Sequence, residues 1–380
     1  MANTLTNLAA DIYKAADIVG RELVGFIPSS TVNAGSEQAA VGQTIRSHAT
    51  RAATVVNYTP SMTIPEGTDQ TVDTATLTLT EQRAVQIPWT GEDVRFVNGG
   101  AGYETVYGDQ IAQAMRALVN EMETDLAQAA YQNASRAVGT AGTTPFASDF
   151  DLIAEARQIL ADNGMPTNDG RSTLILNTSA GTKLRNLAQL QKANESGGSQ
   201  LLRQGTLLDL QGVMIKESAQ VQSHTKGTGA SYLVNDAASA VGDTTIAADT
   251  GSGTILAGDI ITIAGDSNKY VVNSALSGGS FTIGKTGLRA AAADNAAITV
   301  GNSYAANVLM HQNAMELAMR APAQPIGGDA ATDRIVVQDP ASGLVFEIST
   351  YKGYGKNMIS VGAVWGYKVW NSDAIAVLMG

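Results

Sequence analysis

The sequence contains no cysteine in its 380 residues. This absence excludes disulfide bonds, thiolate metal sites and cysteine nucleophiles. Aromatic residues are also scarce, at 5% of the chain, whereas glycine is abundant, with 39 residues. A chain dominated by small residues favours thin sheets and tight turns over one bulky core. Its apolar content of 44% is enough to bury one sizeable core or several small ones.

Positive charge is in short supply as well. The formal net charge is −11 at pH 7, and the sequence pI is about 4.7. No lysine occurs between Lys14 and Lys183. Sequence-independent binding to nucleic acid requires lysine and arginine clustered on one face. The composition therefore argues against tight binding of this kind through a broad basic face and leaves only local basic patches.

Long hydrophobic runs are missing from the chain. The first residues, MANTLTNLAADIYKAAD, lack a basic start followed by a long apolar run, so no signal peptide is expected. No stretch approaches the roughly 18 uninterrupted apolar residues that a membrane span needs. The sequence predicts a soluble protein that is made and kept in a cytoplasm, without a membrane partner.

Catalytic and metal-binding motifs are nearly absent. The three histidines, His48, His224 and His311, are too far apart in the sequence to form a helical metal pair, so each is expected to be a surface or packed structural residue. There is no G-x-S-x-G elbow, no Walker loop and no G-x-G-x-x-G that opens a helix. The spacing of Asp243 and Asp249 fits no known calcium loop. We therefore expect no enzyme activity and no catalytic, cofactor-binding or metal-binding residue.

Three segments precede the longest helical pattern of the chain: a helix, an arm and a ribbon. Apolar residues at helical spacing predict an amphipathic helix over 5–24, and small polar residues without a strong period predict an extended arm over 28–54 that packs on something else. Residues 54–97 alternate between apolar and polar and contain the turn sequence PEGTDQ at 65–70, which is typical of a long two-stranded ribbon. An isolated two-stranded hairpin is marginal in water. The ribbon must therefore lie on its own core or on a neighbouring subunit.

The strongest helical pattern covers residues 103–136, about 30 residues, which corresponds to roughly 45 Å at 1.5 Å per residue. Its apolar stripe comprises Ile111, Met115, Leu118, Val119, Met122 and Leu126. The acidic residues Glu121, Glu123 and Asp125 lie on the same helix, and we expect them to form a solvated or interface face rather than an acid–base pair.

A small α/β unit follows the long helix. Helical patterns cover 149–163 and 179–192, and strand patterns cover 172–177 and 205–218. Gly164 and the proline after it close the first of these helices.

An all-β pattern fills the region from about Gly227 to Ser303. Its six short apolar runs, each flanked by Gly, Asn or Asp, are ASYLVN, TTIAA, DIITIAG, KYVVNS, SFTIG and AAITVG. Such spacing, without a helical signal, predicts a small β-barrel or sandwich, in which residues 255–274 form a hairpin. An insertion costs little loop-closure entropy if its ends are close. We therefore read it as a module inserted into a host domain that resumes at Tyr304 and ends in long strands.

The order of these elements resembles that of the major capsid proteins of tailed bacteriophages, which have the Hong Kong 97 fold. The ribbon is similar to the extended loop of that family, the long helix to its spine helix, and STLILNTSAGTKLRNLAQLQK to its axial domain. The insert, with KGTGASYLV and GDIITIAG, and the ending VWGYKVWNSDAIAVLMG resemble the coat proteins of short-tailed Salmonella phages most closely.

The resemblance implies an α+β fold with a six-stranded β-barrel inserted into an axial α/β domain. It divides the chain into an N-terminal helix and arm (1–53), an extended β-ribbon loop (54–97), a peripheral domain with the spine helix (98–140), the first part of the axial domain (141–226), the inserted barrel (227–303), the axial return (304–326) and the peripheral strands (327–380).

The resemblance also implies a function. The chain would be a coat protein that self-assembles into an icosahedral head around double-stranded DNA, through a scaffold-assisted procapsid that expands on maturation. The implied partners are further copies of the chain in hexamers and pentamers, a scaffolding protein, the portal and a decoration protein. The implied location is the virion capsid, assembled in the cytoplasm of a bacterial host.

Intersubunit contacts are expected on the arm and the ribbon. The candidate contact residues are Arg51, Glu66, Asp69, Arg83, Trp89 and Arg95. Residues 54–97 contain no lysine, so the covalent crosslink that a ribbon lysine forms in some members of the family is not expected here.

Other interpretations remain open at this level. One is an encapsulin-like compartment shell with the same fold. Another is an enzyme or carbohydrate-binding module that uses the barrel at 227–303 in a monomeric chain. A tail-tube or decoration protein is the last, although such proteins are usually shorter and lack the long helix.

Overall fold

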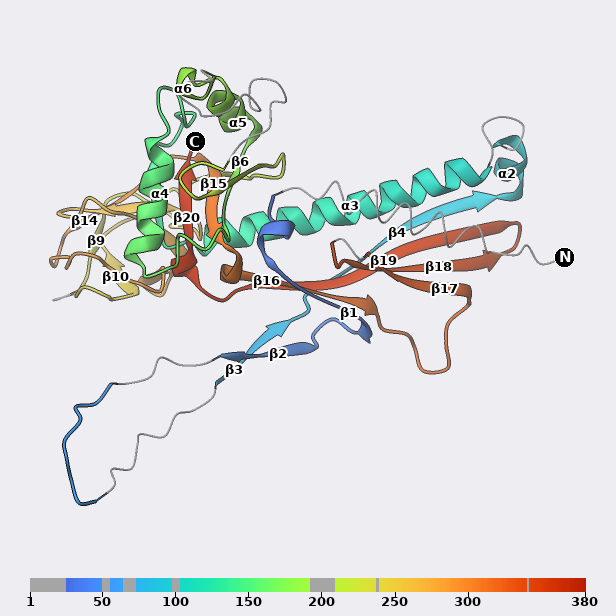
Figure 1. Cartoon of the computed structure of the whole chain (residues 1–380), viewed down its shortest axis with the longest axis horizontal. Coiled ribbons are helices and arrows are strands. Elements are labelled where there is room, and N and C mark those ends of the chain that lie inside the picture. Colours follow the sequence, from blue (N-terminus) through green and yellow to red (C-terminus); the bar gives the residue numbers. More distant parts are fainter. Residues whose placement is uncertain are drawn as a thin grey trace.

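The computed structural model shows an elongated subunit, with a long helix lying along a sheet and a more compact part at one end (Figure 1). The structure describes residues 25–49, 55–63, 73–97, 103–191, 209–236, 239–339 and 342–380. The helix predicted over 5–24 lies outside these residues.

A peripheral sheet forms the long part of the subunit. Its strands run in the order β1-β16-β19-β18-β17, and β4 also pairs with β19. The bounds are β1 (Thr31–Ala39), β4 (Glu81–Thr90), β16 (Met315–Pro322), β17 (Ala331–Gln338), β18 (Val345–Gly353) and β19 (Lys356–Val369). Along β19, Ile359, Val361, Ala363 and Trp365 belong to one buried cluster, because alternate side chains of a strand share a face.

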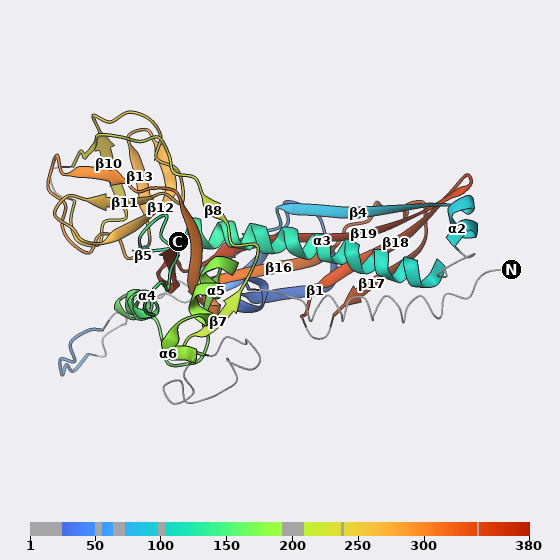
Figure 2. The ribbon, with the colours of Figure 1, turned by 90° about the horizontal axis from the view of Figure 1, so that it is seen from above.

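The helix α3 (Tyr103–Gln132) covers that face of the sheet (Figure 2). Its predicted apolar stripe is confirmed, since Ile111, Met115, Met122 and Leu126 are at most 1% exposed and pack in the same cluster as β19. The helix ends four residues before the predicted end at 136. The reason is tertiary: Ser135 donates its backbone N–H to Ile375, and the next residues form a strand of the axial sheet.

The expectation that residues 54–97 pair with one another is wrong. The ribbon consists of β2 (Thr44–Ala49) and β3 (Asp73–Thr78), which pair antiparallel, so one of its strands comes from the predicted arm. The β4 strand instead pairs with β19 over ten residues, and the short helix α2 (Gly91–Val97) follows it. Alternation correctly identifies a strand, but it carries no information on which distant strand is the partner.

The predicted arm also contains a strand of the peripheral sheet. A single 3-10 turn, η1 (Ile27–Ser29), precedes β1, which pairs in parallel with β16 from Thr31 opposite Glu316 onward. The segment is extended, as predicted, and it packs on its own chain.

The axial part is built on the strands β5-β20-β15-β6-β7, with β8 also paired to β15. The bounds are β5 (Arg136–Gly139), β6 (Ser172–Leu176), β7 (Met214–Glu217), β8 (Ser223–His224), β15 (Tyr304–His311) and β20 (Ile375–Met379). The helices are α4 (Asp151–Asp162), α5 (Thr178–Arg185) and α6 (Ala188–Gln191). The helix predicted over 179–192 is thus split in two, and Gly164, at φ +82°, terminates α4 in the left-handed conformation that glycine favours.

Two predicted boundaries place strands in the wrong sheet. The 3-10 turn η2 (Gln312–Ala314) divides the return segment, so that β15 lies in the axial sheet and β16 in the peripheral sheet. A second such turn, η3 (Ser372–Ala374), carries the chain from β19 back into the axial sheet as β20. The chain therefore crosses between the two sheets at these turns, which no local pattern in the sequence marks.

The prediction of six strands in the insert is confirmed. They are β9 (Tyr232–Val234), β10 (Thr245–Asp249), β11 (Ile260–Ile263), β12 (Lys269–Ser277), β13 (Ser280–Ile283) and β14 (Ala297–Val300). Their order is β11-β14-β9-β10-β13-β12, and the additional pairing of β11 with β12 closes the barrel. The barrel has its own apolar core and joins the axial sheet where β12 pairs with β5.

Candidate functional site

Four highly exposed apolar residues lie between the two ribbon strands. Every described residue from 55 to 63 is exposed. Val55 is 95% exposed, Val56 74%, Tyr58 93% and Met62 107%. In Figure 1 this stretch lies far from the body of the subunit, beyond β2 and β3. Within the described part of the chain, these apolar side chains are left largely unpacked.

The predicted contact residues have different surroundings. Arg83 on β4 is half exposed and forms ion pairs with Glu81 (3.1 Å) and Glu121 (3.0 Å) of its own chain. Arg95 is exposed on α2.

Trp89 is only 6% exposed, and its Nε1 donates to Oε1 of Gln110 at 2.9 Å. It packs inside the subunit, which leaves almost none of its side chain for a neighbouring copy. Arg51, Glu66 and Asp69 lie outside the described residues.

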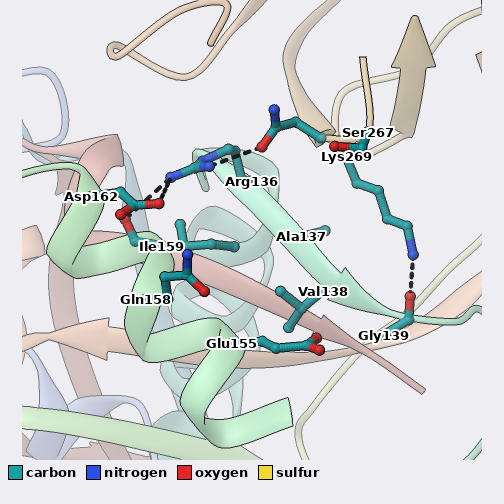
Figure 3. Close-up of a pocket in the computed structure, with 11 residues that line it drawn as sticks. Arg136, Ala137, Val138, Gly139, Glu155, Gln158, Ile159, Asp162, Ser267 and Lys269 are labelled. Atoms are coloured by element: carbon teal, nitrogen blue, oxygen red, sulfur yellow. Dashed lines mark hydrogen bonds and ion pairs between the residues drawn. The ribbon is translucent and has the colours of Figure 1, made fainter. Parts of the chain in front are cut away.

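A cleft of about 430 Å³ separates the barrel from α4 (Figure 3). It is lined by β5, by Glu155, Gln158 and Asp162 of α4, and by the turn that leads into β12. Its two cations already have partners in the chain: Arg136 contacts Asp162, and Lys269 donates to the carbonyl oxygen of Gly139 at 2.5 Å. The described lining residues include no histidine that could act as a base.

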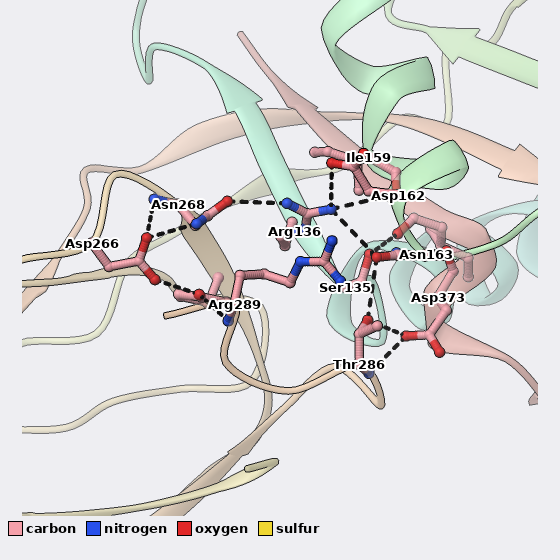
Figure 4. Close-up of polar contacts among 12 residues, drawn as sticks. Ser135, Arg136, Ile159, Asp162, Asn163, Asp266, Asn268, Thr286, Arg289 and Asp373 are labelled. Carbon is pink, nitrogen blue, oxygen red and sulfur yellow. Dashed lines mark hydrogen bonds and ion pairs between the residues drawn. The ribbon is translucent and has the colours of Figure 1, made fainter. Parts of the chain in front are cut away.

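Arg136 lies at the centre of a polar network that joins the barrel to the axial domain (Figure 4). Its side chain is 7% exposed. One Nη donates to Asn268 of the barrel at 3.0 Å, and the other lies 3.4 Å from both Asp162 and Asn163 at the end of α4.

A second contact in the network lies beside the first. Asp373 accepts hydrogen bonds from the backbone N–H and the hydroxyl of Thr286, at 2.8 and 2.5 Å. Both sets of contacts connect the barrel with the axial domain, and together they hold the two parts in one relative position. We call these contacts the joint between the barrel and the axial domain.

Replacing Arg136 with methionine should lower the free energy of unfolding by about 2 kcal/mol, because Asn268 and the end of α4 lose their shared donor in a buried position. Arg289→Met is the matched control, since that arginine is exposed on the barrel and should change stability by no more than about 0.5 kcal/mol. Urea titrations of the two variants test this. Equal midpoints would show that Arg136 does not stabilise the joint.

A second buried cluster lies at the root of the barrel. His224 Nε2 is 2.8 Å from Asp259 Oδ1, and both side chains are at most 6% exposed. The rings of Tyr131 and Tyr304 pack beside the imidazole, with centroids at 5.6 and 5.4 Å. Burial raises the pKa of the Tyr304 hydroxyl, which donates to the carbonyl oxygen of Gly258 at 2.7 Å.

His224 is therefore a packed structural residue, as the sequence indicated. His311 is likewise buried, with Nε2 2.8 Å from Asp169 Oδ2.

The acidic residues of α3 do not form a single solvated face, and the expectation is wrong for Glu123. Glu121 is 42% exposed and pairs with Arg83. Asp125 is partly buried, which raises its pKa, and it accepts a hydrogen bond from the indole of Trp365 at 3.1 Å. Glu123 is only 2% exposed, because α3 passes directly beneath the chain where it approaches β1.

No metal-binding constellation is visible in the described part of the chain. There, no group of three or more histidine, aspartate or glutamate side chains is placed to hold a metal ion. Within the same residues, no helix combines the length and apolarity needed to cross a membrane.

No family model matches the chain, and no curated protein matches it in sequence. Solved structures do. The capsid of the cyanophage P-SCSP1u aligns over 94% of this chain and 88% of its own, at 11% identity and a TM-score of 0.52. A chain of Mycobacterium phage Che8 aligns over 94% and 90%, at 16% identity and a TM-score of 0.49. A virus-like particle from Pyrococcus furiosus aligns over 97% of both chains, at 9% identity and a TM-score of 0.41.

Of these three structures, the cyanophage capsid is the one with a TM-score above 0.5. Because the sequences are only 11% identical, this similarity is evidence for the fold alone. The ribbon, the spine helix α3, the peripheral sheet and the axial domain occur in the order that the capsid resemblance implied. The chain has the Hong Kong 97 fold of phage capsid proteins, with a closed six-stranded barrel joined to its axial domain.

Proposed function

We propose that this chain is the major capsid protein of a tailed bacteriophage, which self-assembles into an icosahedral head around double-stranded DNA. The fold supports this, and the exposed apolar segment at 55–63 is the observation that carries it. Exposed apolar side chains gathered in one segment, unlike those scattered singly over a surface, mark an interaction site. A second copy of the chain would bury the segment in a shell.

The finer parts of the proposal rest on the resemblance to known coat proteins. They are hexamers and pentamers of the chain, a scaffolding protein, a portal, a decoration protein and assembly in the cytoplasm of a bacterial host. The inserted barrel and the C-terminal strand favour similarity to short-tailed Salmonella phages. The net charge of −11 suits weak, non-specific contact with packaged DNA, because DNA must enter and leave the head.

Among the candidate contacts, we propose that Arg83 and Arg95 meet a neighbouring copy. Arg95 is exposed, and Arg83 is about half exposed although it also pairs with acidic residues of its own chain. Arg51, Glu66 and Asp69 remain proposed contacts on the arm and ribbon. The proposed domain division keeps the barrel at 227–303, moves β4, α2 and β16 to the peripheral part and moves β20 to the axial part.

Sedimentation and negative-stain electron microscopy of the purified full chain test the proposal, with a candidate scaffolding protein added where the chain alone does not assemble. Closed shells or capsomer rings are the expected result. A stable, folded monomer that never assembles under either condition would overturn the proposal. DNA in shells taken from the native host would separate a phage head from a cellular compartment.

The double variant Tyr58→Asp/Met62→Asp should abolish assembly, because the neighbouring copy would have to bury two carboxylates without partners. The folded monomer should keep its stability, within about 0.5 kcal/mol, since both side chains are fully exposed. Val241→Asp on the barrel, at 64% exposure, is the control and should still assemble. Shells of normal yield from the double variant would show that this segment is not an interface.

A further inference from the structure

The buried carboxylate of Glu123 accepts hydrogen bonds from the backbone just before β1, the first strand of the peripheral sheet. Glu123 lies in the middle of α3 and is 2% exposed. Its Oε1 accepts the backbone N–H of Phe26 at 2.6 Å, and its Oε2 accepts that of Ile27 at 2.8 Å. These two N–H groups open the turn η1, so Glu123 satisfies donors that the turn itself leaves without an acceptor.

The packing around this contact is close. Gly25 has φ +70°, and a Cβ atom there would lie 2.8 Å from Glu123 Oε1 and 2.9 Å from Ser218 Cβ. Phe26 and Ile27 are at most 1% exposed. Since β1 begins immediately after η1, the position of residues 25–30 sets how the first strand leaves the spine helix.

The site joins a third part of the subunit as well. Ser218, just after β7, lies with its hydroxyl 3.5 Å from Glu123 Oε1. Lys216 of β7 donates its Nζ to the hydroxyl of Ser29 at 3.1 Å, and its charge acts on Glu123. Lys216 is the charged group that acts on Glu123 from the axial domain, while the chain at η1 presents the backbone N–H groups of Phe26 and Ile27.

We propose that Glu123 is a pH-responsive contact that sets how firmly residues 25–30 are bound between the spine helix and the axial domain. The inference concerns the subunit itself. It holds whether or not the chain assembles into a shell, so its failure and that of the capsid proposal are distinguishable.

The sign of the pH effect follows from burial. Desolvation raises the pKa of Glu123 to about 7, and this outweighs the backbone N–H groups, Ser218 and Lys216, all of which lower it. When residues 25–30 leave, the carboxylate meets water and its pKa returns toward the ordinary value of 4.5. The bound state therefore holds more protons between these two values. Binding strengthens as the pH falls through this window and weakens as it rises toward 7.

Hydrogen–deuterium exchange of the Phe26 and Ile27 amides in the full-length, unassembled chain tests this. With pKa values of about 7 and 4.5, protection corrected for intrinsic exchange should rise roughly 30-fold between pH 8 and pH 5.5. The lower pH stays above the sequence pI of about 4.7 and so avoids precipitation at zero net charge. The Val272 amide, in the barrel core, is the internal reference.

The variant Glu123→Gln should remove this pH dependence, because the amide still accepts a hydrogen bond but does not titrate in this range. Glu121→Gln, a similar change two residues away on an exposed side chain, should keep it. A wild-type profile that follows Val272 at every pH, or a Glu123→Gln profile as steep as the wild type, would overturn the proposal. The wild-type profile decides the question even if Glu123→Gln does not fold.

Discussion

An Asp259→Ala variant is expected to lose about 3–5 kcal/mol of its free energy of unfolding, because several donors lose one acceptor and each buried donor left unsatisfied costs about 1–3 kcal/mol. Asp259 is 1% exposed. Its carboxylate accepts the backbone N–H groups of Gly227 at 2.9 Å and Leu256 at 2.7 Å, and it contacts His224 at 2.8 Å. The alanine would leave these three groups without their acceptor, and two of them, Gly227 and His224, are buried.

The loss should be concentrated at the root of the barrel, because Gly227 and His224 lie where the chain enters it. Urea unfolding and amide exchange in β11 and β12 measure the effect. Asp249→Ala is the control, since that aspartate is exposed on β10 of the same barrel and should shift stability by about 0.5 kcal/mol or less. Equal destabilisation by both substitutions would contradict the assigned role of Asp259.

A Trp365→Ala variant is expected to lose about 3–5 kcal/mol, as large-to-small substitutions of buried aromatic residues do. Trp365 lies on β19, is 0% exposed and belongs to the cluster that packs α3 on the peripheral sheet. Its indole N–H also donates to Asp125 of α3 at 3.1 Å. The substitution removes both the packing and this hydrogen bond.

Trp365→Phe separates the two contributions, because it keeps most of the packing and loses the donor. We expect a loss of about 1–3 kcal/mol, since Asp125 is left partly buried without the indole. Trp370→Phe is the matched control at the end of the same strand region, where the side chain is partly exposed and donates to Glu316 at 2.8 Å. Denaturant midpoints followed by fluorescence distinguish the variants, and similar losses for Trp365→Ala and Trp370→Phe would refute the packing argument.

The candidate contacts could be predicted only in part. Arg83 and Arg95 are on the surface, as a contact residue must be, but Trp89 is buried inside the subunit. An aromatic residue in an alternating run signals burial, and the pattern does not distinguish burial within a subunit from burial between subunits. The polar residues that join the barrel to its host, Arg136 and Asp259, were not singled out, because neither lies in a motif.

Glu123 also shows what a sequence pattern cannot predict, here within a single helix. Its neighbours Glu121 and Asp125 have nearly the same sequence context, yet Glu123 is enclosed and the other two reach the surface to different degrees. Helical periodicity assigns a face to each residue. It does not say that another part of the chain will cross that face and bring two backbone N–H groups to the carboxylate.

Local pattern was sufficient for the parts of this protein whose partners are near in sequence. The six strands of the barrel and the end of α4 at Gly164 follow from periodicity and turn residues, and each forms with neighbours in the same segment. The apolar stripe of α3 also follows from periodicity, although it packs against the distant strand β19. Contacts across the whole chain decided the remainder: β2 with β3, β4 with β19, β1 with β16, and the crossing of β15 and β20 into the axial sheet. The alternation of a strand specifies which of its faces is buried. Which strand it pairs with depends on how distant segments pack in the folded subunit, and the local sequence does not contain that information.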